Sequence, residues 1–366
     1  MVVDDPPMVA RSTPAARAPR LLVHVPATLL ERHGQEGFGL YGRVASHMRG
    51  QGIEVRFLER PSTTELDGYT KEDFHLVHHG FLRRFNVLNS GVAYVFPYWY
   101  LDQRGVLCDS SMANATPDLD SVKHEAAVRF FEGMRERLVL GGVSKYEQPA
   151  RAQRFGPGHI AVFLQGMGDP VLRNMFMLET EMLDLVLRHR GEREVVVKPH
   201  PKWPDTMASD HARRLAEETP GLTITDANVH DMLEGAYCSV SICSGASFEG
   251  IFHRTPSILF GRSDFNACAV TVRSAAEAEE ALAGIGAREF DFERFAYWFL
   301  RRKMFNSRNP NVGERVMQRI ARTGFEFLPS KARAQAVPGG DDNGVRVRPL
   351  QGEPGDRGDH VRKVDD

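Results

Sequence analysis

Short apolar runs that alternate with helical segments constrain the fold of this chain most. In the second half, the runs span residues 160–164, 194–197, 222–225, 238–242 and 257–260. Helical patterns lie between or after them, at 175–188, 208–218, 229–236, 246–253 and 275–283. Short buried strands separated by helices are typical of βαβ units, whose strands lie parallel in one sheet. The second half therefore predicts a doubly wound, Rossmann-like α/β domain.

The first half shows a less regular version of the same pattern. Strands are predicted at 21–25, 53–57, 74–77 and 91–96, and helices at 41–49, 81–88 and 123–138. A length of 366 residues fits about two domains. We therefore predict an N-terminal Rossmann-like domain over 21–150 and a C-terminal one over 151–330. The aromatic-rich segment 291–306 is in a position to cross back onto the first domain.

The two ends of the chain differ from the rest in composition. Residues 331–366 are rich in Gly, Pro, Asp and Arg and hold almost no large apolar side chains. Such a segment buries too little apolar surface to offset the entropy lost on ordering. We expect this tail and residues 1–20 to be disordered.

Charge and cysteine usage exclude several classes of protein. The chain has 46 basic and 48 acidic residues, a formal net charge of −2, so a protein that coats nucleic acid is excluded. The four cysteines form no CxxC pair, which argues against a zinc ribbon, and their number suits a reduced cytoplasmic protein. Residues 1–20 lack the apolar core of a signal peptide, and no later apolar run reaches about 18 residues. Any membrane association would be peripheral.

The segment Lys198-Pro199-His200-Pro201 directly follows the strand predicted at 194–197. Ligands of such sheets bind at the carboxyl ends of the strands. Two prolines restrict the backbone around His200, and a lysine and a histidine suit a phosphate group and proton donation. A surface turn that happens to contain a histidine is the alternative.

A second polar turn, residues 244–249, joins the strand at 238–242 to the next helix. Small residues let a ligand approach the backbone, and the first N–H groups of a helix favour an anion. Ser244, Gly245, Ser247 and Glu249 are the candidate binding residues, with Glu249 suited to ribose hydroxyls. Simple N-capping by either serine is the alternative.

Weaker candidates follow other strands. Gln165 begins the loop 165–169, which either reads a base or sugar or is an ordinary glycine turn. The loop 34–39 lacks the GxGxxG spacing of a dinucleotide site but is suited to an acceptor, with Glu36 and His33 as possible bases. His79 and Asp102 are further candidate bases.

No Walker A, HExxH or GxSxG motif occurs. We predict neither a metal site nor a resident cofactor.

The run 195–201, with Cys243-Ser-Gly-Ala-Ser-Phe-Glu249 and Thr255-Pro-Ser-Ile-Leu-Phe-Gly261, resembles bacterial capsule polysaccharide biosynthesis proteins. These are glycosyltransferases of the two-domain GT-B type, similar to capsular Kdo transferases. Gly250 stands where the family often has alanine, and Arg254-Thr-Pro where Gly-Lys/Arg-Pro is common. The resemblance is good over 160–260 and weak in the N-terminal half.

The resemblance implies a nucleotide-sugar donor, CMP-Kdo or another nucleotide sugar, as co-substrate in the C-terminal domain. His200 and Ser244 or Ser247 would then contact the donor phosphate, with Lys198 beside them. The predicted reaction is transfer of the sugar to a saccharide or glycolipid acceptor, with Glu36, His79 or Asp102 taking the acceptor proton. A sugar-nucleotide epimerase, a polyol-phosphate transferase and a non-catalytic capsule-assembly protein are the alternatives.

Overall fold

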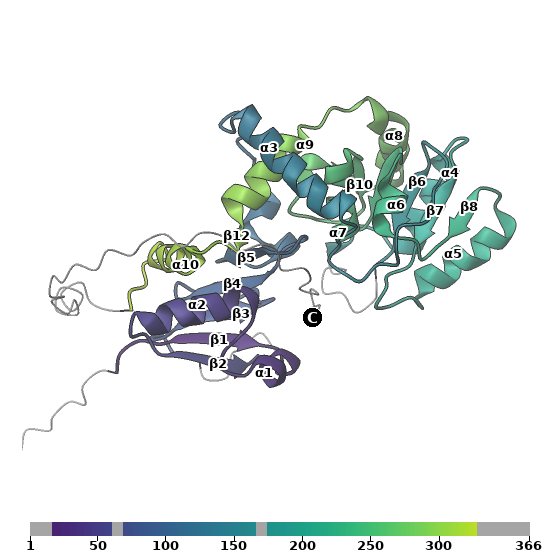
Figure 1. Cartoon of the computed structure of the whole chain (residues 1–366). Coiled ribbons are helices and arrows are strands. Elements are labelled where there is room, and N and C mark those ends of the chain that lie inside the picture. The colour runs from purple at the N-terminus through teal and green to yellow at the C-terminus, as the bar shows by residue number, and fades with distance from the viewer. Residues whose placement is uncertain (1–16, 61–68, 166–173, 328–366) are drawn as a thin grey trace, which may run out of the picture.

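The second half of the chain forms a six-stranded sheet in which every neighbouring pair is parallel (Figure 1). The computed structural model describes residues 17–60, 69–165 and 174–327. The strand order is β11-β10-β9-β6-β7-β8. The strands are β6 (Ile160–Phe163), β7 (Val195–Lys198), β8 (Leu222–Ile224), β9 (Cys238–Ser241), β10 (Ser257–Leu259) and β11 (Val270–Thr271). The predicted doubly wound domain is confirmed.

Helices cover this sheet because each carries an apolar face that needs a partner. They are α4 (Glu179–His189), α5 (Met207–Glu218), α6 (Val229–Leu233), α7 (Gly245–Gly250) and α8 (Ala275–Gly284). Met182, Leu183 and Val186 of α4 are fully buried in the same core as Val195 and Val197 of β7. The helix predicted at 175–188 is therefore present, although it begins at Glu179.

The first sheet has the order β12-β5-β4-β3-β1-β2. Its parallel strands are β1 (Leu21–Val25), β2 (Val55–Glu59), β3 (Phe74–His78) and β4 (Val87–Val92). Two antiparallel strands complete it, β5 (Tyr98–Asp102) and β12 (Phe305–Asn306). Helices α1 (Ala27–His33) and α2 (Gly39–Gly50) follow β1. The chain therefore has the predicted fold class, two Rossmann-like domains of GT-B type.

The helix predicted at 81–88 and the single strand predicted at 91–96 are wrong. Residues 87–92 form β4, which carries the polar side chains of Asn89 and Ser90 in its buried centre. Asn89 exchanges two hydrogen bonds with the backbone of Leu82, at 3.0 and 2.8 Å. These bonds satisfy a buried amide, so a strand without a continuous apolar run is stable here.

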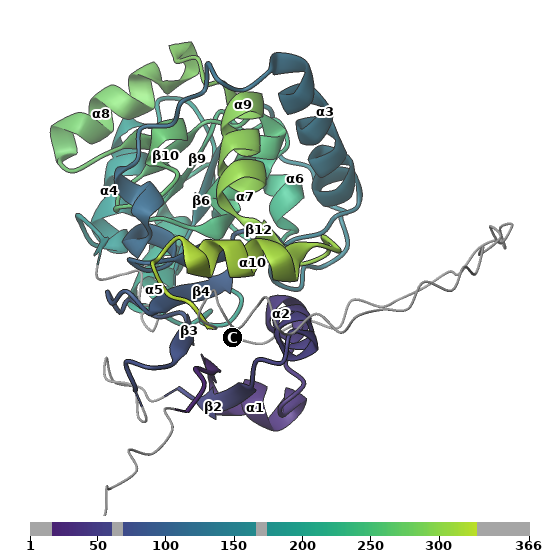
Figure 2. The same ribbon diagram turned by 90° about the vertical axis from the view of Figure 1, so that its left-hand side faces the viewer.

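The chain crosses between the two sheets more often than the predicted boundaries allow. Helix α3 (His124–Arg135), from the first predicted domain, packs against α9 (Phe292–Ala296) beside the second sheet (Figures 1 and 2). After α9 and a π-helical segment, Tyr297–Lys303, the chain returns to the first sheet as β12 and α10 (Val312–Ala321). Helix α10 packs on α2, where Gly313 lies so close to His47 that a Cβ would meet the histidine Cβ at 2.4 Å. The predicted domain 151–330 is therefore corrected, because its last part belongs to the first sheet.

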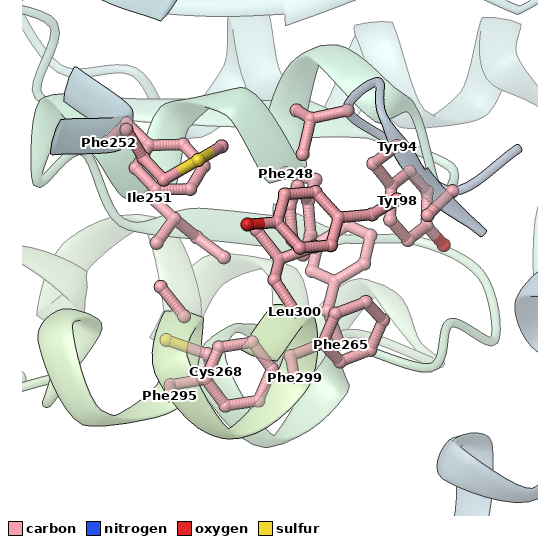
Figure 3. Close-up of a cluster of buried hydrophobic side chains, with 14 of the residues drawn as sticks. Tyr94, Tyr98, Phe248, Ile251, Phe252, Phe265, Cys268, Phe295, Phe299 and Leu300 are labelled. Carbon is pink, nitrogen blue, oxygen red and sulfur yellow. The ribbon is translucent and has the colours of Figure 1, made fainter. Parts of the chain in front are cut away.

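One apolar cluster joins residues from both halves of the chain (Figure 3). Tyr94, which follows β4, stacks on Phe248 of α7 with ring centroids 4.6 Å apart. The Tyr94 hydroxyl donates to Asp264 at 2.7 Å, and Tyr100 and Ser110 donate to the same carboxylate at 2.7 and 3.1 Å. Asp264 follows β10 and is buried, so three hydroxyl groups from the first half hold a carboxylate of the second.

The remaining predictions concern the two ends of the chain, the cysteines and membrane-spanning helices. Residues 1–16, the tail 331–366 and positions 166–169 of the loop after β6 lie outside the described residues. All four cysteines are buried, and none of them forms a disulfide bond with another described residue. Within the described ranges, no helix is both long and apolar enough to cross a bilayer.

Candidate active site

One pocket gathers the carboxyl ends of four neighbouring strands of the second sheet. Its lining includes Gln165 after β6, His200 after β7, Ser244 after β9 and Arg262 after β10. Strands β6 and β9 are neighbours although β7 and β8 separate them in sequence, so the strand order reverses there. Ligands of open α/β sheets bind at such a reversal. Tyr94 and Leu107, from the first half of the chain, also line this strand-end pocket, which therefore contains residues of both halves.

Six of the nine site residues predicted from the sequence line the strand-end pocket. They are Gln165, Lys198, His200, Ser244, Gly245 and Glu249. The other three, Ser247, Glu36 and Asp102, do not line it. The residues predicted to hold the donor are thus brought together, whereas the predicted bases lie elsewhere.

Lys198, the last residue of β7, is buried beneath the pocket with its ammonium group tied to the backbone. Its Nζ donates to the carbonyl oxygens of Asp226 and Ala227, at 2.7 and 2.6 Å. Burial lowers the pKa of Lys198 below its usual value, and the nearby Asp226 opposes that shift. Lys198 therefore connects β7 to the loop after β8 and adds positive charge to the floor of the pocket.

His200 is held in one tautomer by its own turn. The backbone N–H of Lys202 donates to His200 Nδ1 at 3.1 Å, so in the neutral ring the proton resides on Nε2. The ring stacks on Trp203 with centroids 4.7 Å apart and meets Tyr146 edge-on at 5.2 Å. The aromatic contacts and the flanking prolines fix the direction in which Nε2–H points.

The turn after β9 combines a helix cap with a floor of small residues. Ser244 caps α7 by accepting from the N–H of Ala246 at 3.2 Å, which confirms the capping interpretation of this serine. Gly245 lines the pocket. Ser247 is fully buried and its hydroxyl pairs with that of Ser241 at 2.8 Å, behind the pocket. Of the two serines, Ser244 alone lies at the pocket wall.

Glu249 is a buried carboxyl group that forms part of the pocket lining. Ser144 donates to its Oε1 at 2.7 Å, while Oε2 has no hydrogen-bond partner and lies 3.7 Å from His230 Nε2. Burial raises the pKa of Glu249 to about 8, so the group is largely protonated at neutral pH. A protonated carboxyl group both donates and accepts a hydrogen bond, which suits a sugar hydroxyl.

His230 lies next to Glu249 and stacks on a second histidine, His253. The Nε2–H of His230 donates to the carbonyl of Val143 at 3.2 Å, so neutral His230 accepts at Nδ1. His253 Nε2 lies 2.9 Å from that nitrogen and is therefore the donor. Burial, followed by the neighbouring His230, lowers the pKa of His253 to about 3. The pair stays neutral and leaves Glu249 without a buried counter-charge.

Gln165 ties two strand ends together at the pocket floor. Its side-chain Oε1 accepts from the N–H of Cys243 at 2.8 Å, and its own N–H donates to Glu179. This places the amide between β6 and β9, at the reversal of strand order.

Sequence reasoning did not select several pocket residues, among them three that carry charge or aromatic surface. Arg262 follows β10, and Lys145 and Tyr146 come from the connection between the halves. The loop containing Arg262 had the same signal as the others, a polar residue directly after a strand. Lys145 and Tyr146 lie in a stretch with no periodic pattern, so nothing in the sequence indicated them.

The strand order of the first sheet reverses between β1 and β3. His79 lies at the carboxyl end of β3, next to this reversal. His79 directly follows β3 with a φ of 48°, a left-handed conformation that is rare for a residue with a side chain. Arg60 donates to the carbonyls of His78 and His79, at 2.9 and 3.0 Å, and holds this turn. Glu36 is exposed on the loop after α1, and His33 stacks on Phe38 at 5.0 Å.

Asp102 lies at the end of β5, which is antiparallel to β4. Its carboxylate accepts from the N–H groups of Arg104 and Gly105, at 2.7 and 3.3 Å, and from the Ser111 hydroxyl at 2.5 Å. Because β5 runs opposite to its neighbours, its carboxyl end lies at the other edge of the sheet from His79. In the part of the chain that the structure describes, no three acidic, histidine or cysteine side chains gather as a metal site requires.

Comparison with solved structures supports the fold. A Thermosulfurimonas dismutans protein, KpsC, beta Kdo 2,7 transferase, superimposes with a TM-score of 0.50 at 14 % identity, covering 82 % of this chain and 99 % of that one. The beta Kdo 2,4 transferase of the same organism gives 0.49 at 14 % identity, with 78 % and 91 % covered. A UDP-GlcNAc 2-epimerase of Methanocaldococcus jannaschii gives 0.34 at 9 % identity, with 83 % and 99 % covered. No protein-family model and no curated protein sequence matches the chain. The first of these likenesses shows a shared GT-B fold.

Proposed function

We propose that the chain is a glycosyltransferase that binds a nucleotide-linked sugar in the strand-end pocket and transfers the sugar to a saccharide hydroxyl. One observation carries this proposal: three cationic side chains, a histidine and a buried protonated carboxyl group line one pocket. The cations are Lys145, Lys198 and Arg262. They surround the reversal of strand order where ligands of this fold class bind.

The cationic side of the pocket suits the phosphate of the donor. Arginine matches phosphate oxygens with two parallel N–H groups, and His200 presents the Nε2–H that its tautomer dictates. When the bond between the sugar carbon and the phosphate oxygen breaks, the oxygen keeps the electron pair and becomes more negative. Donors already in place stabilise that charge without reorganisation, which lowers the barrier to transfer.

Glu249 suits the hydroxyl groups of the ligand. Among the described residues, none hydrogen-bonds to the buried Glu249 Oε2, and leaving such an atom unsatisfied is costly. A ribose or sugar hydroxyl would satisfy it. Tyr146 and Trp203 supply aromatic surface beside His200 for a base or sugar ring.

The acceptor hydroxyl loses its proton as its oxygen bonds to the sugar carbon, and a base must receive that proton. Of the three predicted bases, geometry favours His79. It lies at the carboxyl edge of the first sheet, at the reversal of strand order, in a strained conformation. Asp102 lies at the opposite edge with its oxygens engaged, and Glu36 is exposed on a loop.

The donor class we propose is a CMP-linked acidic sugar such as CMP-Kdo, with a surface or capsule polysaccharide as acceptor. The Lys198-Pro-His-Pro and Ser244 to Glu249 motifs resemble those of capsular Kdo transferases, and the neighbour with the shared fold is named as a beta Kdo 2,7 transferase. An acidic sugar carries a carboxylate in addition to the nucleotide phosphate. Several cations in one pocket would accommodate both.

The test is a thermal-shift screen of the purified chain against CMP, UDP, GDP and their sugars, followed by transfer assays. A ligand that binds the native state alone raises the unfolding temperature by mass action. We expect CMP compounds to give the largest shift, and His200→Ala to lose it while His189→Ala, a partly exposed histidine at the end of α4, keeps it. Conversion of the donor without an acceptor would indicate an epimerase, and no shift with any nucleotide would contradict the proposal.

A further inference from the structure

A second pocket, separate from the strand-end pocket, is strongly basic. It lies at the junction of β5, β12 and α10, beside the first sheet, and its residues come from three distant parts of the chain. Five cationic side chains line it: Arg302, Lys303, Arg315, Arg319 and Arg322. The two pockets share no lining residue. We call this second site the basic pocket.

In the part of the chain that the structure describes, the lining of the basic pocket holds far more positive than negative charge. Asp102 is the one carboxylate in its lining, is 2 % exposed, and is already satisfied by three hydrogen bonds. Among the described ion pairs, none involves any of the five cations. The segment 301–322 holds seven basic residues and one acidic residue, whereas the whole chain has a net charge of −2. Like charges gathered without counter-charges repel one another, and a bound anion removes that cost.

The protein holds several of these cations in position. Arg302 donates to the hydroxyl and carbonyl oxygens of Ser121, at 2.6 and 2.7 Å. Arg319 donates through Nε to the carbonyl of Leu101 at 3.2 Å, which leaves the outer guanidinium nitrogens directed away from that bond. The Arg315 guanidinium lies over the Phe305 ring at 5.4 Å. Side chains fixed in this way lose less entropy when they bind a ligand.

We propose that the basic pocket binds a phosphate group that belongs to a multiply charged ligand. Four of the five cations are arginines, whose planar forks match phosphate oxygens better than single carboxylates do. The lining also includes the apolar side chains of Leu101, Met112 and Phe305. Free pyrophosphate-type anions and phospholipid head groups both present this chemistry, and the experiment separates them.

The experiment compares the full-length chain with Arg315→Gln/Arg322→Gln and with the control Arg129→Gln/Arg214→Gln. The control arginines are exposed on α3 and α5, and neither lines the basic pocket. Calorimetric titration with sodium pyrophosphate measures the free-anion source. Flotation with vesicles of phosphatidylcholine alone, or mixed with phosphatidylglycerol, measures the lipid source.

We expect the wild type and the control to bind pyrophosphate or the anionic vesicles, and the pocket variant to bind about 100-fold more weakly, because two charge-assisted bonds are lost. Added salt should weaken the binding. Binding by the pocket variant equal to the control, or no binding of either probe by the wild type, overturns the proposal. Thermal unfolding of the pocket variant checks its fold, and nucleotide binding checks its strand-end pocket. Should the double variant not fold, Lys303→Gln, at an exposed position, replaces it in the binding measurements.

Discussion

Glu249 gives the sharpest quantitative prediction, because its carboxyl group is buried in the strand-end pocket and the effect of burial on its pKa outweighs the opposing effect of Lys145. In the folded chain its pKa is raised by burial to about 8, against a usual value of 4.5. The folded state therefore binds the proton between these two values, while the unfolded state has released it. The contribution of Glu249 to the free energy of unfolding must fall as the pH rises from about 4.5 to about 8. Above that pH it stays constant.

The size of this effect follows from the same two values. Each pH unit in the window costs about 1.4 kcal/mol, and an interval of about 3.5 units sums to an upper limit of about 5 kcal/mol. Glutamine has the shape of the protonated acid but cannot ionise. Glu249→Gln should therefore gain stability relative to the wild type as pH rises from 5 to 8.

The assay is urea unfolding of both proteins at several pH values between 5 and 9. His24 and His253, whose pKa values are lowered to about 3 by burial, act in the opposite direction, since the unfolded state alone takes up their protons below about 6.5. Their contribution cancels in the difference between variant and wild type. Glu217→Gln, on the exposed side of α5, is the matched control. A difference between Glu249→Gln and wild type that does not change with pH would refute the reasoning.

Three further predictions concern catalysis and the contact between the halves. His200→Ala should lower kcat about 10²- to 10³-fold by removing a donor to the leaving phosphate, and His200→Gln should lose less; full transfer activity in the alanine variant would exclude the role. His79→Asn should lower kcat about 10²-fold or more, whereas an unchanged kcat would return the choice of base to Glu36. Asp264→Ala leaves the hydroxyls of Tyr94, Tyr100 and Ser110 without their acceptor, at a cost of about 1–3 kcal/mol each. Urea unfolding should therefore show that the free energy of unfolding falls by several kcal/mol. A fall below about 1 kcal/mol would mean that the contact between the halves does not depend on this carboxylate.

The second sheet could be predicted because its local and global signals agree. Apolar runs such as Val195–Lys198 are buried on both faces, so the sequence period and the burial coincide. The polar turns after those strands then locate the pocket, since parallel strands end at one edge. This reasoning needs no knowledge of distant contacts, which is why Lys198, His200 and Ser244 were placed together.

The misplaced residues depend on contacts that a sequence pattern does not contain. Asp102 was a candidate base, but it ends an antiparallel strand that the sequence did not predict, so it lies at the other edge of the sheet. Ser247 was assigned to the pocket from its spacing, but the first turn of α7 points it toward Ser241. The return of β12 and α10 to the first sheet depends on packing against β5 and α2, more than 200 residues earlier in the sequence.

The central claim, that the strand-end pocket holds the nucleotide of a sugar donor, is tested most directly by a crystal structure of the chain with CMP. The account predicts that the phosphate lies within hydrogen-bond distance of His200 Nε2 and Arg262, and that a ribose hydroxyl meets Glu249. A nucleotide bound at the edge of the first sheet beside His79, with the strand-end pocket lacking it, would contradict the claim.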